Sequence, residues 1–229
     1  MSAAATPDIE VVRHPRARRM KLSVDNATGQ VRLTLPPRAP VGPAMQWVRE
    51  QQPWIDRALA RRTLPQPFVP GAVVPYLGVE VTLGWDSGFP RTPVLDDGQL
   101  IVGGPREGFE RRIALWLQRR ARDLLSAETA EYAKLAGVTV SAVGIGDPRA
   151  RWGSCASSGV IRYSWRLILA PPPVRRATVA HEVAHRVHMN HSPAFHALVR
   201  ELYGREPARE RAWLRANAMR LHSFGRESG

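Results

Sequence analysis

The chain has 229 residues, of which 44% are hydrophobic and 23% charged; this is the balance of a globular protein with one ordinary domain, or one domain and a small subdomain. With 33 Lys and Arg against 20 Asp and Glu, the formal net charge is +13, which favours polyanionic partners such as nucleic acid or nucleotides. Cys155 is the only cysteine, so an intramolecular disulfide and a cysteine-based zinc knuckle are excluded, and any bound metal must be held by histidine and carboxylate side chains.

No apolar segment of the sequence approaches the roughly 20 residues that a membrane-spanning helix needs. The N-terminal segment MSAAATPDIE also lacks the basic stretch and the apolar run of a signal peptide. We therefore expect a cytoplasmic protein without a membrane partner.

The first part of the chain combines short strand patterns with one helical pattern. Alternating apolar and polar residues predict strands at 8–12, 20–25, 31–36, 73–78, 80–85 and 99–103. The polar segment 25–30 predicts a hairpin turn. Helical spacing over 44–62 is interrupted by Pro53, which predicts a kink or a junction between two turns. We expect residues 1–105 to form an N-terminal β-rich subdomain with one helix.

The second part begins with a long amphipathic pattern. From Glu107, apolar residues recur at helical spacing up to a stop at Gly137. Two strand patterns and three helical patterns follow, at 138–145 and 160–169 for the strands and at about 174–189, 193–204 and 207–222 for the helices. This order predicts an α+β fold in which residues 106–229 form the catalytic core, built from a long helix, a short sheet and a histidine-bearing helix.

Five of the seven histidines fall in the segment 181–196. His181, Glu182 and His185 spell HExxH, and on a helix the side chains at i and i+4 share one face about one turn apart. Two imidazoles placed in this way can bind one zinc ion at roughly 2.0–2.1 Å. Because the rest of the helix is mostly apolar, these polar side chains would be costly to bury without a partner, and a metal supplies one.

Catalytic zinc usually takes three protein ligands and leaves a fourth position for water. His188 shares the helix face but would lie about 10 Å further along the axis, too far to bind the same ion. His191 qualifies if the chain turns back. The sequence predicts such a turn, because Asn190 tolerates the left-handed conformation of a helix end, and Ser192 and Pro193 suit the start of a new helix. We therefore expect His191 to be the third ligand.

Two alternatives remain for the third ligand. Glu201 would supply a carboxylate, although the apolar face of its helix leaves it among polar residues. His196 lies one turn into the same helix, where packing or exposure to water accounts for it better than metal binding does. Glu182 lies beside the ligand pair, which suits a general base that takes a proton from zinc-activated water and returns it to the leaving group. The implied reaction is hydrolysis of a polarised carbonyl or phosphoryl centre.

Three motifs of the segment 151–195 resemble the core of the YgjP-like metal-dependent hydrolases. They are WGSC at 152–155, WRLILAP at 165–171, and NHS at 190–192 three residues before Phe195. The likeness covers most of the chain, because 31–40, 54–62 and 73–78 also match landmarks of the family.

The family belongs to the zincin-like metallopeptidases and is similar to the SprT-like proteases, which act on DNA-bound proteins. The resemblance implies a zincin-like core and one Zn²⁺ per chain. It also implies His181, His185 and His191 as ligands and Glu182 as the catalytic base. Ser164 departs from the family pattern, in which Asn is expected.

The strand predicted at 160–168 supplies further candidates. It would place Ile161, Tyr163, Trp165 and Leu167 on one face and Arg162, Ser164 and Arg166 on the other. In zincins, a strand beside the active helix offers its edge to an extended peptide, and this strand is the candidate. Candidate contacts for the substrate strand or the transition state are Arg162 and Tyr163 on this strand and His188 after the histidine pair. The oxyanion donor stays open between Tyr163, His188 and an arginine. Trp152 and Cys155 are interpreted as packing and turn residues.

The leading hypothesis for function is a zinc metallopeptidase acting on a peptide or protein. The first alternative is a nucleotide (UTP) pyrophosphatase, an activity attributed to a YgjP-like protein, with arginines holding the triphosphate. Against this alternative, the chain has no GxxxxGK[ST] loop and no acidic cluster suited to magnesium. A second alternative is a basic, nucleic-acid-associated protein whose zinc only stabilises the fold.

Overall fold

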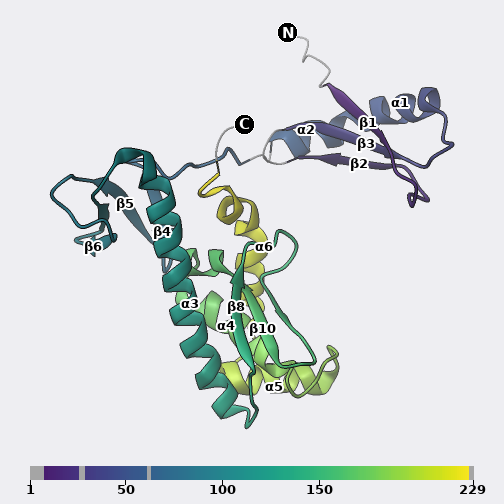
Figure 1. Ribbon diagram of the computed structural model, residues 1–229. Coiled ribbons are helices and arrows are strands. Elements are labelled where there is room, and N and C mark those ends of the chain that lie inside the picture. The colour runs from purple at the N-terminus through teal and green to yellow at the C-terminus, as the bar shows by residue number, and fades with distance from the viewer. Residues whose placement is uncertain (1–7, 26–28, 61–62, 227–229) are drawn as a thin grey trace. The chain divides into compact units, whose positions relative to one another are not determined.

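A computed structural model describes residues 8–25, 29–60 and 63–226 and divides the chain into two compact units. Unit 1 is Met1–Gln66 with Arg226–Gly229, and unit 2 is Pro67–Gly225 (Figure 1). The sequence predicts a boundary after residue 105, whereas this division groups residues 67–105 with the histidine-bearing second part of the chain. The α+β character expected from the sequence is confirmed in both units.

Unit 1 is a three-stranded sheet with two helices. Its strands are β1 (Ile9–Arg13), β2 (Lys21–Val24) and β3 (Val31–Leu35), in the order β1-β3-β2. Strand β3 pairs in parallel with β1 and antiparallel with β2. Val31, Leu33 and Leu35 alternate along β3 and are fully buried in one cluster with Val48 and Ile55 of the two helices.

Two sequence predictions concern the connections of unit 1. The antiparallel pairing of β2 with β3 agrees with the predicted hairpin, and Asp25 N–H donates to the Gln30 carbonyl at 2.9 Å. The residues 26–28 of that turn lie outside the described part of the chain, as do 61–62 at the end of the predicted helix. The predicted junction near Pro53 is confirmed, because α1 (Val41–Glu50) ends and α2 (Gln52–Ala60) begins there, with Pro53 in its first turn.

Unit 2 begins with a four-stranded sheet in the order β4-β5-β7-β6. The strands are β4 (Val73–Tyr76), β5 (Val79–Trp85), β6 (Val94–Asp96) and β7 (Gln99–Val102). The two-residue turn between β4 and β5 has positive φ at both Leu77 (54°) and Gly78 (82°), as a type I′ hairpin requires. Leu77 N–H donates to the Ile168 carbonyl at 2.8 Å, and a Cβ on Gly78 would lie 2.8 Å from Cα of Pro171. This close contact joins the sheet to the segment just before the histidine helix, and it explains why residues 67–105 belong to unit 2.

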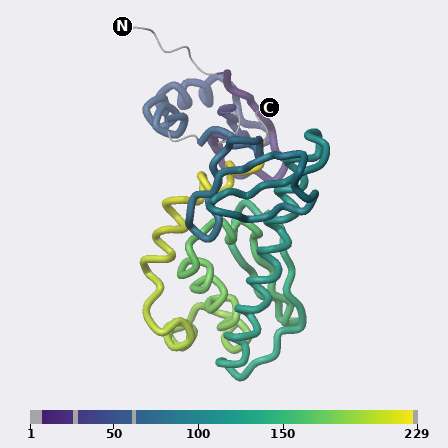
Figure 2. The backbone as a smooth tube through the Cα atoms, turned by 90° about the vertical axis from the view of Figure 1, so that its left-hand side faces the viewer, coloured from purple at the N-terminus to yellow at the C-terminus, as the bar shows by residue number. Residues whose placement is uncertain are grey.

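The remainder of unit 2 is a helical layer on a small second sheet. After a 3₁₀ turn, η1 (Arg106–Gly108), come α3 (Phe109–Leu135), β8 (Ala142–Gly146), β9 (Gly153–Cys155), β10 (Val160–Ser164), a second 3₁₀ segment η2 (Trp165–Leu169), α4 (Pro172–Ala184), α5 (Pro193–Tyr203) and α6 (Ala208–Ser223). Within this unit α4 lies between α3 and α6 (Figures 1 and 2). The predicted long helix is confirmed as α3. No helix in the described ranges is long and apolar enough to cross a membrane.

The strand predicted over 160–169 is wrong in its second half. Strand β10 ends at Ser164, whose Oγ accepts the N–H of Arg166 at 3.3 Å and caps η2. Arg166, expected on a polar strand face, is instead 2% exposed. Its guanidinium pairs with both carboxylate oxygens of Asp147 (2.6 and 3.0 Å) and donates to the carbonyls of Leu221 and Phe224 (2.8 and 2.7 Å). A short polar side chain at 164 thus converts a strand into a turn that buries the following arginine.

Candidate metal centre

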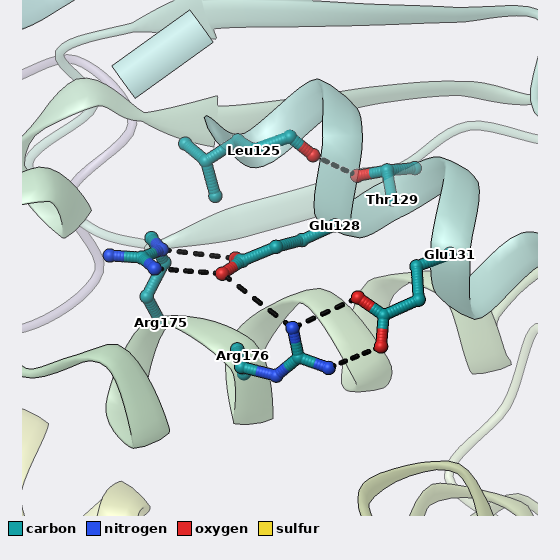
Figure 3. A network of polar contacts seen from close by, with 6 residues as sticks. All are labelled: Leu125, Glu128, Thr129, Glu131, Arg175 and Arg176. Atoms are coloured by element: carbon teal, nitrogen blue, oxygen red, sulfur yellow. Dashed lines mark hydrogen bonds and ion pairs between the residues drawn. The ribbon is translucent and has the colours of Figure 1, made fainter. Parts of the chain in front are cut away.

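Helix α4 carries the HExxH sequence and is fixed to α3 by buried charge. Arg175 donates two hydrogen bonds to Glu128, at 3.0 and 2.7 Å, and both side chains are almost fully buried. Arg176 pairs with Glu131 and lies 3.9 Å from Glu128, so two arginines of α4 meet two glutamates of α3 (Figure 3). A buried pair of this kind is costly to break, because removing one partner leaves an uncompensated charge. The first half of α4 is therefore held in a fixed position.

Helix α4 ends earlier than the sequence predicts. The expected helix runs to about 189, whereas α4 ends at Ala184 and His185 is its C-cap. The carbonyl of His188 consequently lies 3.0 Å from Nδ1 of His185, where it accepts a hydrogen bond from the ring. This hydrogen bond places the proton on Nδ1 and leaves Nε2 of His185 with a free lone pair.

The corner after α4 brings His191 back to the helix. The expectation of a left-handed Asn190 is wrong, because the only described non-glycine residues with positive φ are Leu77 and Asp97. Instead, Oδ1 of Asn190 accepts the N–H of Ser192 at 3.3 Å, which closes a tight side-chain turn. Ser192 caps α5 by accepting the Phe195 N–H at 3.3 Å, and Pro193 occupies the first turn, as the sequence predicts.

His181, His185 and His191 converge on one point. Each offers one ligand atom, and these atoms all lie within 4.8 Å of one another; among the described residues no second group of His, Cys, Asp and Glu side chains does so. Nε2 of His191 lies 3.2 Å from Nε2 of His181. Two ligands of one tetrahedral ion, each bonded at 2.0–2.1 Å, lie about 3.3 Å apart, so this spacing fits a shared metal.

The protonation of these rings also fits a metal. Burial, with the neighbouring His185 and His191, lowers the pKa of His181 to about 4, and burial lowers the pKa of His185 as well. Neutral imidazoles are the form that binds a metal. Three nitrogen donors suit zinc and neighbouring transition metals better than magnesium or calcium, which prefer oxygen ligands.

Phe195 packs among the three histidines. Its ring centroid lies 4.9, 4.5 and 4.8 Å from those of His181, His185 and His191, and the side chain is fully buried. The sequence pattern identifies Phe195 only as part of the apolar face of α5. Its place between the rings depends on the corner at 185–192, and no sequence signal beyond the resemblance indicates it.

Glu182 of α4 lies against strand β9. It is 6% exposed, and this burial raises its pKa to about 7, an effect that the positive charge of Arg151 partly opposes. A Cβ on Gly153 would lie 2.5 Å from Oε1 of Glu182 and 2.6 Å from its Cγ. The glycine of the WGSC motif is therefore required by the close approach of the carboxylate, a role that sequence reasoning missed.

The peptide-binding strand expected at 160–168 is misassigned. Strand β10 is the middle strand of its sheet, paired in parallel with β8 and antiparallel with β9, so neither of its edges is open. The strand next to α4 is β9, which the sequence conceals in the Gly- and Ser-rich segment 146–159. Because β9 ends the sheet on the side of Glu182, it is the edge strand at the site.

The side chains of the other candidate residues are not part of the group of three converging histidines. Tyr163 is 1% exposed, with its hydroxyl 3.0 Å from Oγ1 of Thr129, and burial raises its pKa. Arg162 is exposed on β10, next to Gly144 of β8. His188 contributes its backbone carbonyl, and its side chain is half-buried.

The remaining alternatives also fall outside the ligand set. The candidate ligand Glu201 is exposed on α5, and the ring of His196 lies 6.2 Å from that of His191. Cys155, interpreted from the sequence as a packing and turn residue, is half-buried in β9, and burial raises the pKa of its thiol.

A pocket of about 270 Å³ opens beside the cluster. Its lining combines α4, the start of α6 and the segment before β9: Arg151, Trp152, Gly153, Val174, Ala177, Thr178, His181, Glu182, Pro207, Glu210, Arg211 and Leu214. His181 and Glu182 thus face a space that can hold part of another molecule.

Comparison with known families gives one finding. The family model described as "YgjP-like, metallopeptidase domain" matches residues 18–217, which is most of the chain. No curated protein and no solved structure matches the chain significantly. The match covers the whole His181–His191 segment and agrees with a centre that binds a metal for hydrolysis.

Proposed function

The chain belongs to the YgjP-like family of metallopeptidase domains, and on this premise we propose that it is a zinc-dependent peptidase with Glu182 as its general base. The observation that carries the proposal is the buried carboxylate of Glu182, which lines one pocket together with His181, one of three converging imidazoles. Membership of the metallopeptidase family implies a metal-dependent hydrolase. The proposal adds that the metal is zinc and that the substrate is a peptide or protein.

His181, His185 and His191 would hold the ion through their Nε2 atoms. A zinc ion held in this way would supply Lewis acidity toward the substrate carbonyl and would lower the pKa of the attacking water molecule. The hydrogen bond from His185 Nδ1 to the His188 carbonyl keeps one ligand in the required tautomer. The packing of Phe195 against all three rings limits their rotation.

Glu182 would move the proton. Its carboxylate accepts a proton from the attacking water and passes that proton to the nitrogen of the leaving amine. Burial makes this carboxylate more basic than a glutamate in water, which brings it closer to the proton affinity needed near neutral pH.

Arg151 would stabilise the negative charge that develops on the substrate oxygen. It lines the same pocket as Glu182, is exposed, and forms no ion pair with any acidic side chain in the described ranges. Its charge acts on Glu182 without a direct ion pair, so its guanidinium can donate hydrogen bonds to an oxyanion. Of the candidates for this role, Tyr163 is less suitable, because its hydroxyl is buried against Thr129.

Strand β9 would bind the substrate backbone. An extended peptide can add to a sheet edge through main-chain hydrogen bonds, and β9 is the edge beside Glu182. A peptide at this edge would carry its scissile carbonyl past His181 and Glu182.

The test combines metal analysis with turnover. We expect one zinc per chain in the wild type and loss of zinc in His181→Ala, His185→Ala and His191→Ala. Glu182→Gln should keep the metal and lose about 10²- to 10⁴-fold in kcat on a casein or quenched-peptide substrate. Full activity in Glu182→Gln would end the proposed mechanism.

The same samples separate the alternatives. Release of pyrophosphate from UTP that depends on Glu182, without peptide cleavage, would replace the peptidase with a nucleotide hydrolase. DNA binding that weakens steeply with salt and is unchanged in Glu182→Gln, with no turnover of any substrate, would favour a nucleic-acid-associated zinc protein.

A further inference from the structure

The pocket beside Glu182 has walls that the hydrolytic chemistry does not require. Trp152, Val174, Ala177 and Leu214 give it an apolar side that extends from His181 toward the start of α4. We propose that this pocket is a substrate subsite that holds one apolar side chain next to the scissile bond, of the size of leucine, methionine or phenylalanine. This inference rests on the proposed peptidase function and adds to it the class of residue that is recognised.

The size of the pocket favours one side chain. At about 270 Å³ it lies just below the roughly 300–1,000 Å³ of sites that enclose a whole small-molecule ligand. A single bulky side chain can fill this volume, whereas a nucleotide with three phosphates cannot be enclosed in it.

The chemistry of the walls favours an apolar occupant. Val174, Ala177 and Leu214 are at most 8% exposed, so the surface that they show to the pocket is a small apolar area framed by protein. Burying a side chain of the size of leucine against such a surface removes apolar area from water and therefore favours binding.

The charges around the pocket disfavour a charged occupant. Glu210 is already bound by Arg205, and Arg211 is bound by Glu206. A lysine or arginine of the substrate would meet Arg151 and Arg211, and of the two lining carboxylates Glu210 is bound by Arg205 while Glu182 is buried and is assigned to the attacking water. An acidic side chain would compete with the substrate oxygen for Arg151 and would have to leave water to lie against Val174 and Leu214.

The wall formed by Trp152 is fixed in advance. Its ring stacks on His222 of α6 at 5.0 Å, and its carbonyl accepts the Ser164 N–H at 2.9 Å. The segment before it is held by the pair between Asp147 and the buried Arg166. A preformed wall lets a side chain bind without an additional cost of ordering the protein.

The experiment measures peptide binding without turnover. Zinc-loaded Glu182→Gln protein is titrated calorimetrically with acetyl-Ala-Gly-X-Ala-amide, in which X is Gly, Ala, Leu, Phe, Glu or Lys. We expect the Leu and Phe peptides to bind at least about 10-fold more tightly than the Gly peptide, and the Glu and Lys peptides no more tightly than Gly.

Two further substitutions locate the preference. Ala177→Leu, added to Glu182→Gln, fills the pocket and should reduce the ratio between Leu and Gly peptides to about twofold. Leu214→Ala enlarges the pocket and should shift the preference from Leu toward Phe. The matched control is Ala212→Leu, an exposed position of α6 that does not line the pocket, and it should leave the series unchanged.

The outcomes are distinct from those of the proposed function. Equal binding of Gly and Leu peptides, a preference for Glu or Lys, or a Leu preference that survives in Ala177→Leu would overturn the inference. So would the absence of binding by every peptide up to about 1 mM in a variant that retains its zinc. If the wild type cleaves peptides without this preference, the peptidase proposal stands and the subsite fails; if the preference exists and no peptide is cleaved, the subsite stands and the peptidase proposal fails.

Discussion

Gly153→Ala should impair Glu182 while leaving the metal site intact. Gly153 has no positive φ, so alanine fits the backbone, and the effect is steric. The new Cβ would lie 2.5 Å from Oε1 of Glu182, where ordinary contact begins at 3.4 Å, so the carboxylate must move by about 0.9 Å. A displacement of about 1 Å in a catalytic group costs on the order of 10²-fold in rate, and overpacking a buried contact costs about 1–3 kcal/mol of stability.

The assay compares kcat on a quenched peptide with zinc content and unfolding free energy in the same preparation. The control is Gly144→Ala on β8 of the same sheet, where the nearest atom is Cγ of the exposed Arg162 at 3.2 Å, which can shift. Gly153→Ala should lose about 10²-fold in kcat and retain its zinc, whereas Gly144→Ala should change neither. Wild-type kcat in Gly153→Ala would refute the argument for Glu182, and simultaneous loss of zinc would indicate that the substitution damages the fold instead.

Four other outcomes follow from contacts in unit 2. Arg166→Met leaves the carbonyls of Leu221 and Phe224 without their donor and should lower the unfolding free energy by about 3 kcal/mol in urea titrations; an unchanged midpoint would contradict the buried arginine. Ser192→Ala removes the cap of α5 and should cost about 1 kcal/mol of stability, with weaker zinc binding in competition with a chelator. His188→Ala should keep zinc content and peptide turnover within about twofold, because only the backbone carbonyl of His188 contacts His185; a tenfold loss would assign a role to the imidazole. Chelation of the metal should lower the unfolding temperature of the wild type and not that of His185→Ala, since an ion bound only by the folded state at 1,000 times its Kd adds about 4 kcal/mol.

The part of the site that is periodic in sequence could be predicted. His181 and His185 are one helical turn apart, so their common face follows from helix geometry alone. Ser192 and Pro193 are strong helix-start residues, and they place a corner where His191 can return to the helix. Helix spacing and helix-start residues are patterns of residues close together in the sequence, so they can be recognised without a structure.

The rest of the site depends on contacts between distant segments. Strand β9 is three residues long and rich in small side chains, so no alternation indicates it, and only its pairing with β10 makes it a strand. The sequence pattern places Arg166 on the polar face of a strand. In the structure Ser164 caps η2, and the Arg166 side chain pairs with Asp147. Gly153 is indistinguishable in sequence from a turn glycine, because its requirement comes from Glu182 across the interface with α4.

The early end of α4 explains how the ring of His185, the proposed second ligand, is oriented. In a helix that continued to residue 189, the carbonyl of His188 would point along the axis toward a later N–H group and could not accept from the ring of His185. Because α4 ends at Ala184, residues 185–187 form a turn instead of continuing the helix. This turn places the His188 carbonyl beside Nδ1 of His185. The pairs of Arg175 and Arg176 with α3 hold the other end of the helix, so the loss of its last turn does not loosen His181. A shorter helix with one fixed end therefore orients the ligands better than the longer helix that the sequence pattern predicts.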